Sequence, residues 1–219
     1  MQIDRPPSQI AAVILAAGAS TRMGTPKQLL EWQGRSLLRS ITETAIAANC
    51  DPIIIVLGAS SDSAKRRHSQ RIQAEIIDLP VQIVNNPEWQ TGMGSSIRTG
   101  IQALLVQLCC TGGNRNMDVN AAILLLCDQP FVSPQIIRQL RSTYDATHQS
   151  IVAASYQDTI GVPALFDRQL FPELLKLTCA EGAKVVIKNH LNATVTIDFP
   201  QGSIDLDTPQ DYQQILNNL

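Results

Sequence analysis

The chain has 219 residues, of which 44% are hydrophobic and 16% are charged, and its formal net charge is -2 at pH 7. This composition is typical of a globular protein with a substantial core and excludes a disordered chain. The charge provides no general attraction to nucleic acid or to an anionic membrane, so neither is expected as a partner. An anionic ligand would have to be held by a local group of donors and cations.

No segment resembles a linker, so we expect a single domain over residues 1–219, with a flexible N-terminus at residues 1–9. The cysteines number five and form no C-x-x-C pair, which is typical of reduced thiols. No apolar run approaches the roughly 20 residues that span a bilayer. The apolar stretch 10–20 has some features of a secretory signal peptide, but removing it would delete a strand that the sheet needs. We therefore expect a cytoplasmic protein.

Short apolar runs alternate with longer amphipathic stretches along the chain. In chain order, strands are expected at 11–15, 52–58, 81–85, 121–127, 150–155 and 193–197, and helices at 36–49, 60–75, 95–110, 134–147, 168–176, 181–190 and 208–218. An exposed loop is expected at 111–116. Because the strands are continuous apolar runs, helices should cover both faces of their sheet. The expected fold class is α/β, as a three-layer α/β/α sandwich with a mostly parallel central sheet.

The segment after the first expected strand, LAAGASTRMGTPKQLL at residues 15–30, predicts an anion site. In such sheets, ligands bind at the carboxyl ends of the strands. Gly18 and Gly24 allow the backbone to come close to a ligand, so that successive amide N–H groups can face it. Arg22 and Lys27 add two positive charges. The expected ligand is a polyphosphate, and the alternative is a solvated turn whose two cations face water.

Two common phosphate loops do not fit this segment. A Walker A loop has four residues between its glycines, whereas five separate Gly18 from Gly24, and Thr25 and Pro26 precede Lys27. The dinucleotide-binding fingerprint G-x-G-x-x-G is absent as well. The segment is therefore a different kind of phosphate loop.

Asp128 directly follows the apolar run 121–127. A carboxylate at the end of a buried strand is costly unless it is compensated, and a divalent metal carried by a nucleotide would compensate it. The alternative is a turn or N-cap aspartate ahead of the helix at 134–147. Mg²⁺ prefers oxygen ligands and usually takes one or two carboxylates, so a second acid is expected. Asp205 and Asp207 are candidates, on the same side of an extended segment.

The segment TGMGSS at residues 91–96 opens the helix expected at 95–110. Its amides and the hydroxyl groups of Ser95 and Ser96 can serve as an N-cap and nothing more. Trp89, just before it, can stack on an aromatic ligand, although packing is the commoner role of a tryptophan.

Together these segments resemble a known family. Residues 15–27 match L-A-A-G-x-x-x-R-M-G-x-x-K, the signature of nucleotidyltransferases with the glycosyltransferase-A-like, Rossmann-like fold. Four further segments follow in the order found in the molybdenum cofactor cytidylyltransferases, which are MobA-like NTP transferases. These segments are NPEWQTGMGSSIRTG (86–100), LLLCDQPFVSP (124–134), GVPALF (161–166) and DLDTPQDY (205–212). The resemblance covers nearly the whole chain.

The resemblance implies that the chain transfers a nucleotidyl group from CTP to a phosphorylated acceptor such as molybdopterin, releases pyrophosphate, and serves a molybdoenzyme as partner. It implies catalytic roles for Arg22, Lys27 and Asp128, and an Mg²⁺ ion held by Asp128 and Asp207, with Asp205 as the alternative second ligand. The residues that it implies in nucleotide binding are Leu15, Ala16, Ala17, Gly18, Arg22, Gly24, Lys27, Gly92, Met93, Gly94 and Ser95.

The chain departs from the family pattern where the acceptor is expected. Val162 replaces a histidine that often lies between glycine and proline, and Cys179 and Ala180 replace a glycine and an aspartate. Lys184 and Lys188 share one helical face and could meet an acceptor phosphate or simply face water. Two other functions therefore stay open: a cytidylyl- or uridylyltransferase acting on another small phosphate, and a nucleotide-binding cofactor chaperone without transfer activity.

Overall fold

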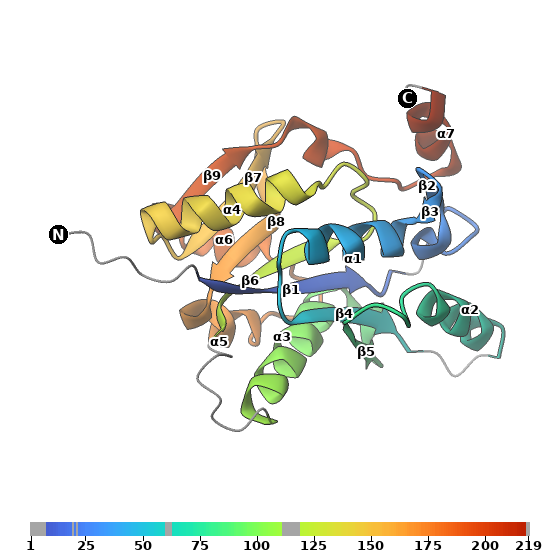
Figure 1. The fold of residues 1–219 in the computed structure, drawn as a ribbon, viewed down its shortest axis with the longest axis horizontal. Coiled ribbons are helices and arrows are strands. Elements are labelled where there is room, and N and C mark those ends of the chain that lie inside the picture. Colours follow the sequence, from blue (N-terminus) through green and yellow to red (C-terminus); the bar gives the residue numbers. More distant parts are fainter. Residues whose placement is uncertain (1–7, 19, 21, 60–62, 111–118, 218–219) are drawn as a thin grey trace.

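The computed structural model describes residues 8–18, 20, 22–59, 63–110 and 119–217. Within this part of the chain, seven strands form one sheet in the order β5-β4-β1-β6-β8-β7-β9 (Figure 1). The strands are β1 (Gln9–Ala16), β4 (Ile53–Gly58), β5 (Gln82–Asn86), β6 (Val119–Leu126), β7 (Ile151–Tyr156), β8 (Thr159–Asp167) and β9 (Thr194–Asp198). β1, β4, β5 and β6 run parallel, β9 is parallel to β7, and β8 is antiparallel to both its neighbours.

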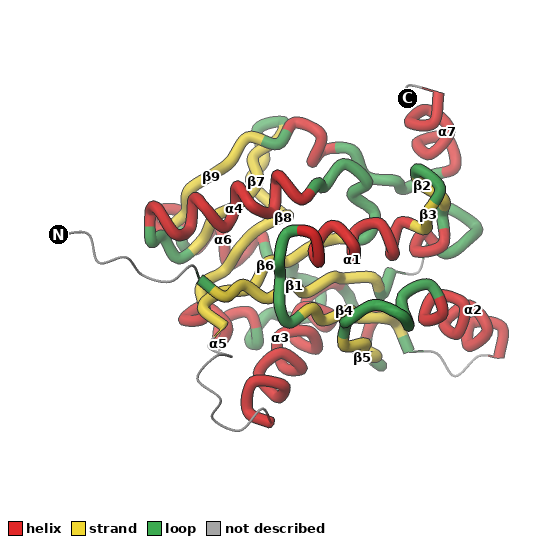
Figure 2. Tube along the Cα trace, viewed as in Figure 1, coloured by secondary structure: helices red, strands yellow, loops and turns green. Residues whose placement is uncertain are grey.

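Helices cover both faces of this sheet (Figure 2). One face packs against α1 (Leu37–Ala47), α2 (Ser63–Ala74) and α4 (Pro134–Thr147), and the other against α3 (Met93–Cys110), α5 (Phe171–Leu174) and α6 (Lys184–Asn189). Along β1, Ile10 and Ile14 face the first layer, whereas Val13 and Leu15 face the second. This alternation follows from the two-residue period of a strand. It confirms the mostly parallel three-layer fold expected from the continuous apolar runs.

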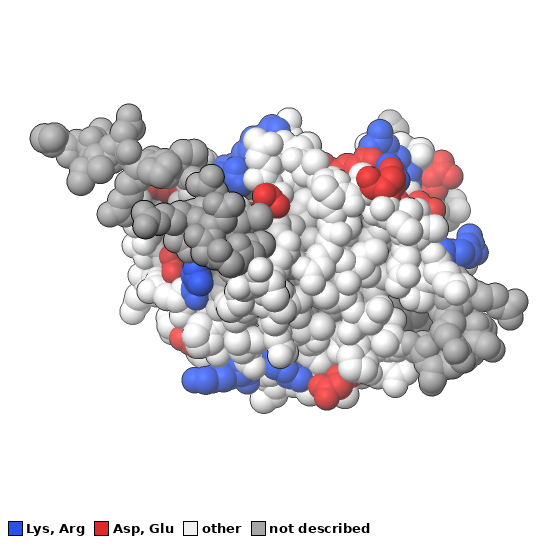
Figure 3. All heavy atoms as spheres, turned by 60° about the horizontal axis from the view of Figure 1, so that its bottom comes forward, with Lys and Arg blue, Asp and Glu red and all other residues white. Residues whose placement is uncertain are grey.

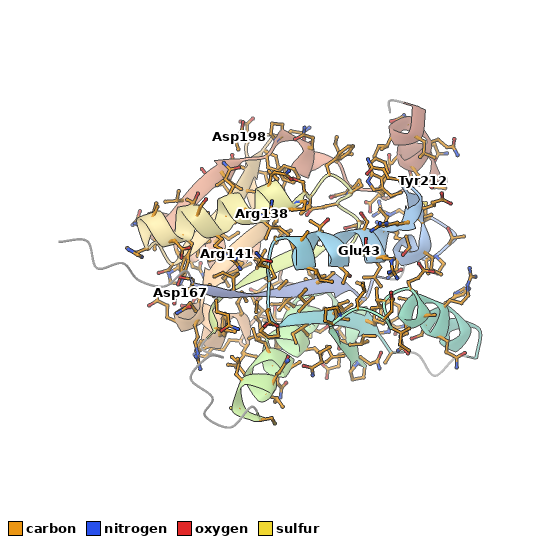
Figure 4. The ribbon with its side chains drawn as sticks, in the orientation of Figure 1. Glu43, Arg138, Arg141, Asp167, Asp198 and Tyr212 are labelled. Atoms are coloured by element: carbon orange, nitrogen blue, oxygen red, sulfur yellow. The ribbon has the colours of Figure 1, made fainter. Side chains whose placement is uncertain are left out.

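Hydrogen bonds at both ends of α1 help to fix it in the helix layer that it forms with α2 and α4. Ser36 caps α1, because its side chain accepts a hydrogen bond from the Arg39 N–H. At the other end of α1, Arg138 and Arg141 from α4 donate to the Ala47 and Asn49 carbonyl groups, at 2.5 and 2.7 Å (Figure 4). These guanidinium groups satisfy carbonyls that the end of a helix leaves without partners.

A small apolar cluster lies outside the two main layers. It joins the hairpin β2 (Glu31–Trp32) and β3 (Arg35–Ser36) to α7 (Pro209–Asn217), and Figure 1 shows α7 beside that hairpin. Trp32, Leu206 and Ile215 are buried in the cluster, and the Tyr212 hydroxyl donates to the Glu31 carbonyl at 2.6 Å. The cluster therefore fixes the segment 204–208, which follows the last strand.

The sequence-based assignments differ from the structure mainly at β8. The sequence GVPALF lies in this strand, which forms a hairpin with β7 and inserts between β7 and β6. Gln157 and Asp158 both have positive φ, at 44° and 58°, as a tight primed turn requires. Gly161 and Pro163 obscured the strand in the sequence, because both residues usually weaken one.

Other boundaries shift by smaller amounts. The helix expected at 168–176 is a 3-10 turn at Arg168–Leu170 followed by α5, and that expected at 181–190 shortens to α6. Gln9 is already the first residue of β1, so the flexible N-terminus expected at 1–9 does not include it. Residues 1–7, 60–62 and 111–116 lie outside the described part of the chain. Within that part, none of the helices has the length and apolar character that crossing a membrane requires.

Candidate functional site

A cavity of about 550 Å³ opens at the carboxyl ends of β1 and β6. Its wall comes from four places: the loop after β1, the start of α3, the end of β6 and the segment before α7. The lining residues are Leu15, Ala17, Gly18, Ser20, Arg22, Lys27, Gln28, Trp89, Gln90, Gly92, Met93, Ser96, Leu126, Cys127, Asp128 and Asp207. The fold thus brings together residues from the first, middle and last parts of the sequence.

The loop after β1 is held in shape by its own hydrogen bonds. Ser20 and Gly24 have positive φ, at 52° and 74°, and the Ser20 hydroxyl accepts from the Lys27 N–H at 2.9 Å. Gln28, which is buried, donates its side-chain amide to the Ala16 carbonyl at 2.6 Å. The loop therefore curves back over the end of β1 and turns the Lys27 side chain into the cavity.

Four charged side chains meet in the cavity. The Lys27 ammonium lies 2.5 Å from Asp207 Oδ1 and 3.0 Å from Asp128 Oδ2. Arg22 binds the other oxygen of Asp207, with 2.6 Å between Nη2 and Oδ2. The side chain of Lys27 is 14% exposed and that of Arg22 is 68% exposed. Both cations of the loop thus bind acids, although most of the Arg22 side chain remains exposed to water.

These contacts fix the charge states of Lys27 and Asp207. Burial lowers the pKa of Lys27, but the hydrogen bond to Asp207 and the charge of Asp128 outweigh it, so the pKa is raised overall. The hydrogen bond from Lys27 and the nearby positive charges lower the pKa of Asp207. Both groups are therefore charged at neutral pH.

Backbone contacts place the acids. The Leu206 N–H donates to the Asp128 carbonyl at 3.2 Å, which ties the segment before α7 to the end of β6. Asp211 accepts hydrogen bonds from the Asp207 and Thr208 N–H groups, at 3.2 and 2.7 Å. It therefore has the helix-start role expected of an acid in the first turn of α7.

Asp205 lies near the same centre but has a different environment. The Asp205 side chain is exposed, but the surrounding protein partly desolvates its carboxyl group. This desolvation and the charges of Asp128 and Asp207 raise the pKa of Asp205 to about 6. Of the two candidate second acids, Asp207 is the one that forms ion pairs with the loop cations in the described part of the chain.

The glycines of TGMGSS are required by a neighbouring backbone segment. Gly92 has a φ of 130°, and a Cβ there would lie 2.1 Å from the Cys179 carbonyl oxygen. A Cβ on Gly94 would lie 2.0 Å from the Thr178 carbonyl oxygen, and the Gly94 N–H donates to the Cys179 carbonyl at 3.2 Å. Glycine is therefore needed where the loop at 178–181 crosses the start of α3, a contact that the sequence pattern did not reveal.

The residues expected to bind a nucleotide divide into three groups. Leu15, Ala17, Gly18, Arg22, Lys27, Gly92 and Met93 line the main cavity. Ala16 and Gly24 line an adjoining cavity of about 330 Å³, on the side of α2. Gly94 and Ser95 line neither of these cavities in the described structure, and the buried Ser95 hydroxyl is held by Asn86 at 2.8 Å. Ser95 therefore supports the wall from behind.

Trp89 separates the two cavities and lines both. Its indole N–H donates to the Ala59 carbonyl at 2.7 Å, and a Cβ on Gly58 would lie 3.1 Å from the ring. The tryptophan is therefore packed against the end of β4, in agreement with its commoner role.

A second polar group lies beside Asp128, on the side of β8. The buried Gln129 donates to the Val162 and Gly202 carbonyl groups, at 3.3 and 3.2 Å, and the Tyr156 hydroxyl donates to the Val162 carbonyl at 3.1 Å. Sequence reasoning did not single out Gln129 or Tyr156, although Gln129 directly follows Asp128. Together they tie Val162 of β8 to the segment that follows β6 and to β7.

Lys184 lies next to this group. A Cβ on Gly161 would lie 3.1 Å from Lys184 Cε, so the lysine side chain passes directly over β8. Its charge acts on Asp205 and lowers the pKa of that carboxyl, against the larger effects that raise it. Among the described residues Lys184 forms no ion pair that the structure records. Lys184 thus brings a positive charge to the edge of the acidic centre.

The donor set fits a metal ion that arrives with its own oxygen ligands. The described residues contain no group of three or more His, Cys, Asp or Glu side chains that could hold a metal. Asp128 and Asp207 nevertheless converge on one nitrogen, so they are close enough to share a cation. Two carboxylates completed by phosphate and water match the preference of Mg²⁺.

On the face drawn in Figure 3, Lys, Arg, Asp and Glu lie mainly around the rim of a largely uncharged surface, and acidic and basic side chains lie close together at the upper right. This distribution gives no basic stripe for a nucleic acid on that face.

Comparison with known proteins agrees with this geometry. The family described as the MobA-like NTP transferase domain matches residues 12–195. The nicotine blue oxidoreductase of Paenarthrobacter nicotinovorans is 29% identical, over 94% of this chain and 96% of that protein. The molybdenum cofactor cytidylyltransferase of Escherichia coli strain K12 is 21% identical, over 94% of each. A Mycobacterium tuberculosis H37Rv protein solved in complex with manganese is 25% identical, with a TM-score of 0.67 over 97% of this chain and 100% of that one.

Proposed function

Because this chain belongs to the MobA-like NTP transferase family and is a nucleotidyltransferase, we propose that it transfers CMP from CTP to the phosphate of molybdopterin or of its molybdenum form. Pyrophosphate is the second product, and a molybdoenzyme is the partner that receives the modified cofactor. The observation that carries the proposal is the meeting of Arg22 and Lys27 with Asp128 and Asp207 in one cavity. The five cysteines are all free thiols, which supports a reaction in the cytoplasm.

The loop after β1 binds the triphosphate. Arg22 and Lys27 supply two positive charges for the β- and γ-phosphates, and the backbone amides around Gly18 supply further donors. Negative charge builds on the leaving pyrophosphate as the bond to the α-phosphorus breaks, so these cations stabilise the transition state more than the bound substrate. The enzyme's contribution is therefore position and charge, as in other phosphoryl transfers.

Asp128 and Asp207 would hold the divalent ion. When bound, such an ion neutralises phosphate charge and fixes the geometry of the triphosphate. The manganese complex of the mycobacterial protein supports a divalent metal in this fold. Mg²⁺ is the ion that we propose, because the ligands are carboxylates and phosphates without sulfur or imidazole.

The nucleobase lies between the start of α3 and the loop after β1. Gly92 and Met93 line that side of the cavity, and a backbone edge can recognise the amine and carbonyl groups of a base without a charged side chain. CTP is proposed because the Escherichia coli relative is named as a cytidylyltransferase.

The acceptor approaches from the side of β8. Its phosphate oxygen is already anionic, so no protein nucleophile or strong base is needed. Lys184 is the cation that we assign to this phosphate, because it lies over β8 and its charge reaches Asp205. In-line attack requires that the acceptor oxygen approach the α-phosphorus from the side opposite the leaving pyrophosphate.

One assay tests this function. The protein is incubated with Mg²⁺ and CTP, GTP or UTP against molybdopterin, sugar phosphates and methylerythritol phosphate, and pyrophosphate is measured. We expect release only with CTP and molybdopterin, and loss of at least a hundredfold in kcat/KM with Lys27→Ala. Lys188→Ala, an exposed lysine on the same helix as Lys184, is the matched control. Normal turnover by Lys27→Ala would overturn the assignment of the loop.

A second candidate is transfer to a different small phosphate. The replacement of the expected histidine by Val162, and of the expected glycine and aspartate by Cys179 and Ala180, favours it, since the chain departs here from the family pattern where the acceptor is expected. Val162 lies in β8, on the side from which we propose that the acceptor approaches. The same assay distinguishes the two candidate functions, because transfer to a different small phosphate would release pyrophosphate with an acceptor other than molybdopterin. Binding of Mg-CTP without pyrophosphate from any acceptor would instead indicate a cofactor chaperone.

A further inference from the structure

The four charges in the cavity satisfy one another in the ligand-free protein. Both oxygens of Asp207 are taken, Oδ1 by Lys27 at 2.5 Å and Oδ2 by Arg22 at 2.6 Å. Lys27 also binds Asp128 at 3.0 Å. The two cations assigned to phosphate are thus the partners of the two acids assigned to the metal.

The Lys27 ammonium lies where a shared cation would have to lie. It is within hydrogen-bond distance of both carboxylates, and its side chain is only 14% exposed. A divalent ion that used one oxygen from each acid would need the same space, and it would meet a fixed positive charge there. Two positive ions cannot occupy one position between two carboxylates.

A bound triphosphate competes with Asp128 and Asp207 for Lys27 and Arg22. Its oxygens offer Lys27 and Arg22 partners at least as strong as carboxylates, because charge-assisted bonds to phosphate are among the stronger hydrogen bonds in proteins. Lys27 has a flexible four-carbon stem and can turn from the acids to a phosphate without movement of the backbone. The acids would then be left without a partner, which favours entry of a divalent ion beside them.

We propose that Lys27 occupies the divalent-cation position of the free protein and leaves it only when a polyphosphate takes the lysine, so that metal and nucleotide bind as one unit. This inference rests on the proposed function for the identity of the polyphosphate. It adds that the acids alone are a poor metal site in this protein. The binding of metal and the binding of phosphate are therefore coupled, each raising the affinity for the other by the same factor.

The test measures Mn²⁺ binding without any nucleotide. Free Mn²⁺ is followed by its electron paramagnetic resonance signal during titration into wild-type protein, Lys27→Gln and Lys184→Gln. Lys27→Gln removes the ammonium between the acids, and we expect at least about tenfold tighter binding than in the wild type. Lys184→Gln removes a positive charge that is near the acids but not between them, and we expect a change within about twofold.

Arg22→Gln provides a second variant that does not endanger the fold, because the Arg22 side chain is 68% exposed. It frees only Oδ2 of Asp207, so we expect a smaller gain than with Lys27→Gln. Equal Mn²⁺ affinity in wild type and Lys27→Gln would overturn the inference. Absence of measurable binding in both would overturn it as well, since the two acids would then hold no cation.

A separate titration uses inorganic tripolyphosphate and its preformed Mn²⁺ complex with the wild type. We expect the complex to bind at least about tenfold more tightly than tripolyphosphate alone, and equal affinities would contradict the coupling. Failure of the wild type to bind either form would reject the triphosphate site of the proposed function. The nucleotide-free Mn²⁺ comparison would still decide whether Lys27 blocks the cation.

Discussion

Where the 178–181 loop crosses the start of α3, next to the cavity wall, Gly94 has no room for even the smallest side chain. A Cβ there would lie 2.0 Å from the Thr178 carbonyl oxygen and 2.8 Å from that of Glu181. Both obstacles are backbone atoms, so no side chain can turn away. The loop or the helix would have to retreat by about an ångström, and Ile97 and Ile101 bury this part of α3 in the core.

Gly94→Ala should therefore destabilise the protein. Overpacking of this kind costs about 1–3 kcal/mol and occasionally more, and the retreat also breaks the bond from the Gly94 N–H to the Cys179 carbonyl. The better helix propensity of alanine returns up to about 1 kcal/mol. We expect a net loss of roughly 2 kcal/mol, which for a chain of this length lowers Tm by roughly 4–8 °C.

Thermal unfolding followed by circular dichroism measures this change. Gly18→Ala is the matched control, because it is the same substitution at a glycine of the cavity lining, where a Cβ would meet nothing within 4 Å. We expect its Tm to stay within about 2 °C of the wild type. A Gly94→Ala protein as stable as the wild type would refute the reasoning, because the helix propensity would then have outweighed the clash.

Three further outcomes are expected. Lys184→Ala raises KM for the phosphorylated acceptor about tenfold and leaves KM for CTP unchanged, whereas Lys188→Ala changes neither. Asp207→Asn lowers kcat/KM at least about a hundredfold, and added Mn²⁺ does not rescue it. Burial raises the pKa of Cys50 to about 11, so this thiol's contribution to stability is complete below the ordinary thiol pKa and is lost as the pH rises through 11. At pH 8, a thiol reagent should modify the exposed Cys109 within minutes and Cys50 only after unfolding.

The sequence predicted those parts of the molecule that depend on local pattern. Continuous apolar runs located the parallel strands, and the position of Asp128 after such a run placed it at the end of β6. The loop after β1 could be singled out as a candidate phosphate site because its glycines and cations lie within one short segment. Each of these signals is contained in about a dozen neighbouring residues.

The remaining features depend on contacts between distant segments. Glycine at 92 and 94 reflects the backbone of residues 178–181, more than 80 positions away in the chain, and no local pattern records that crossing. The choice of Asp207 over Asp205 as the partner of Lys27 depends on the hydrogen bond from the Leu206 N–H to Asp128. The strand β8 was missed because its pairing with β6 and β7 outweighs the low strand propensity of Gly161 and Pro163.

The small apolar cluster between the β2–β3 hairpin and α7 connects two parts of the cavity wall that lie far apart in the sequence. The hairpin follows Lys27, and α7 follows Asp207. The packing of Trp32 and Ile215 in one cluster therefore holds the segment with Lys27 next to the segment with Asp207. The family match covers residues 12–195, so it includes the hairpin but ends before the part of the cluster that Leu206 and α7 supply. Trimming the protein to residues 12–195 would therefore keep Arg22, Lys27 and Asp128 but discard Asp207, the acid with which both cations form ion pairs.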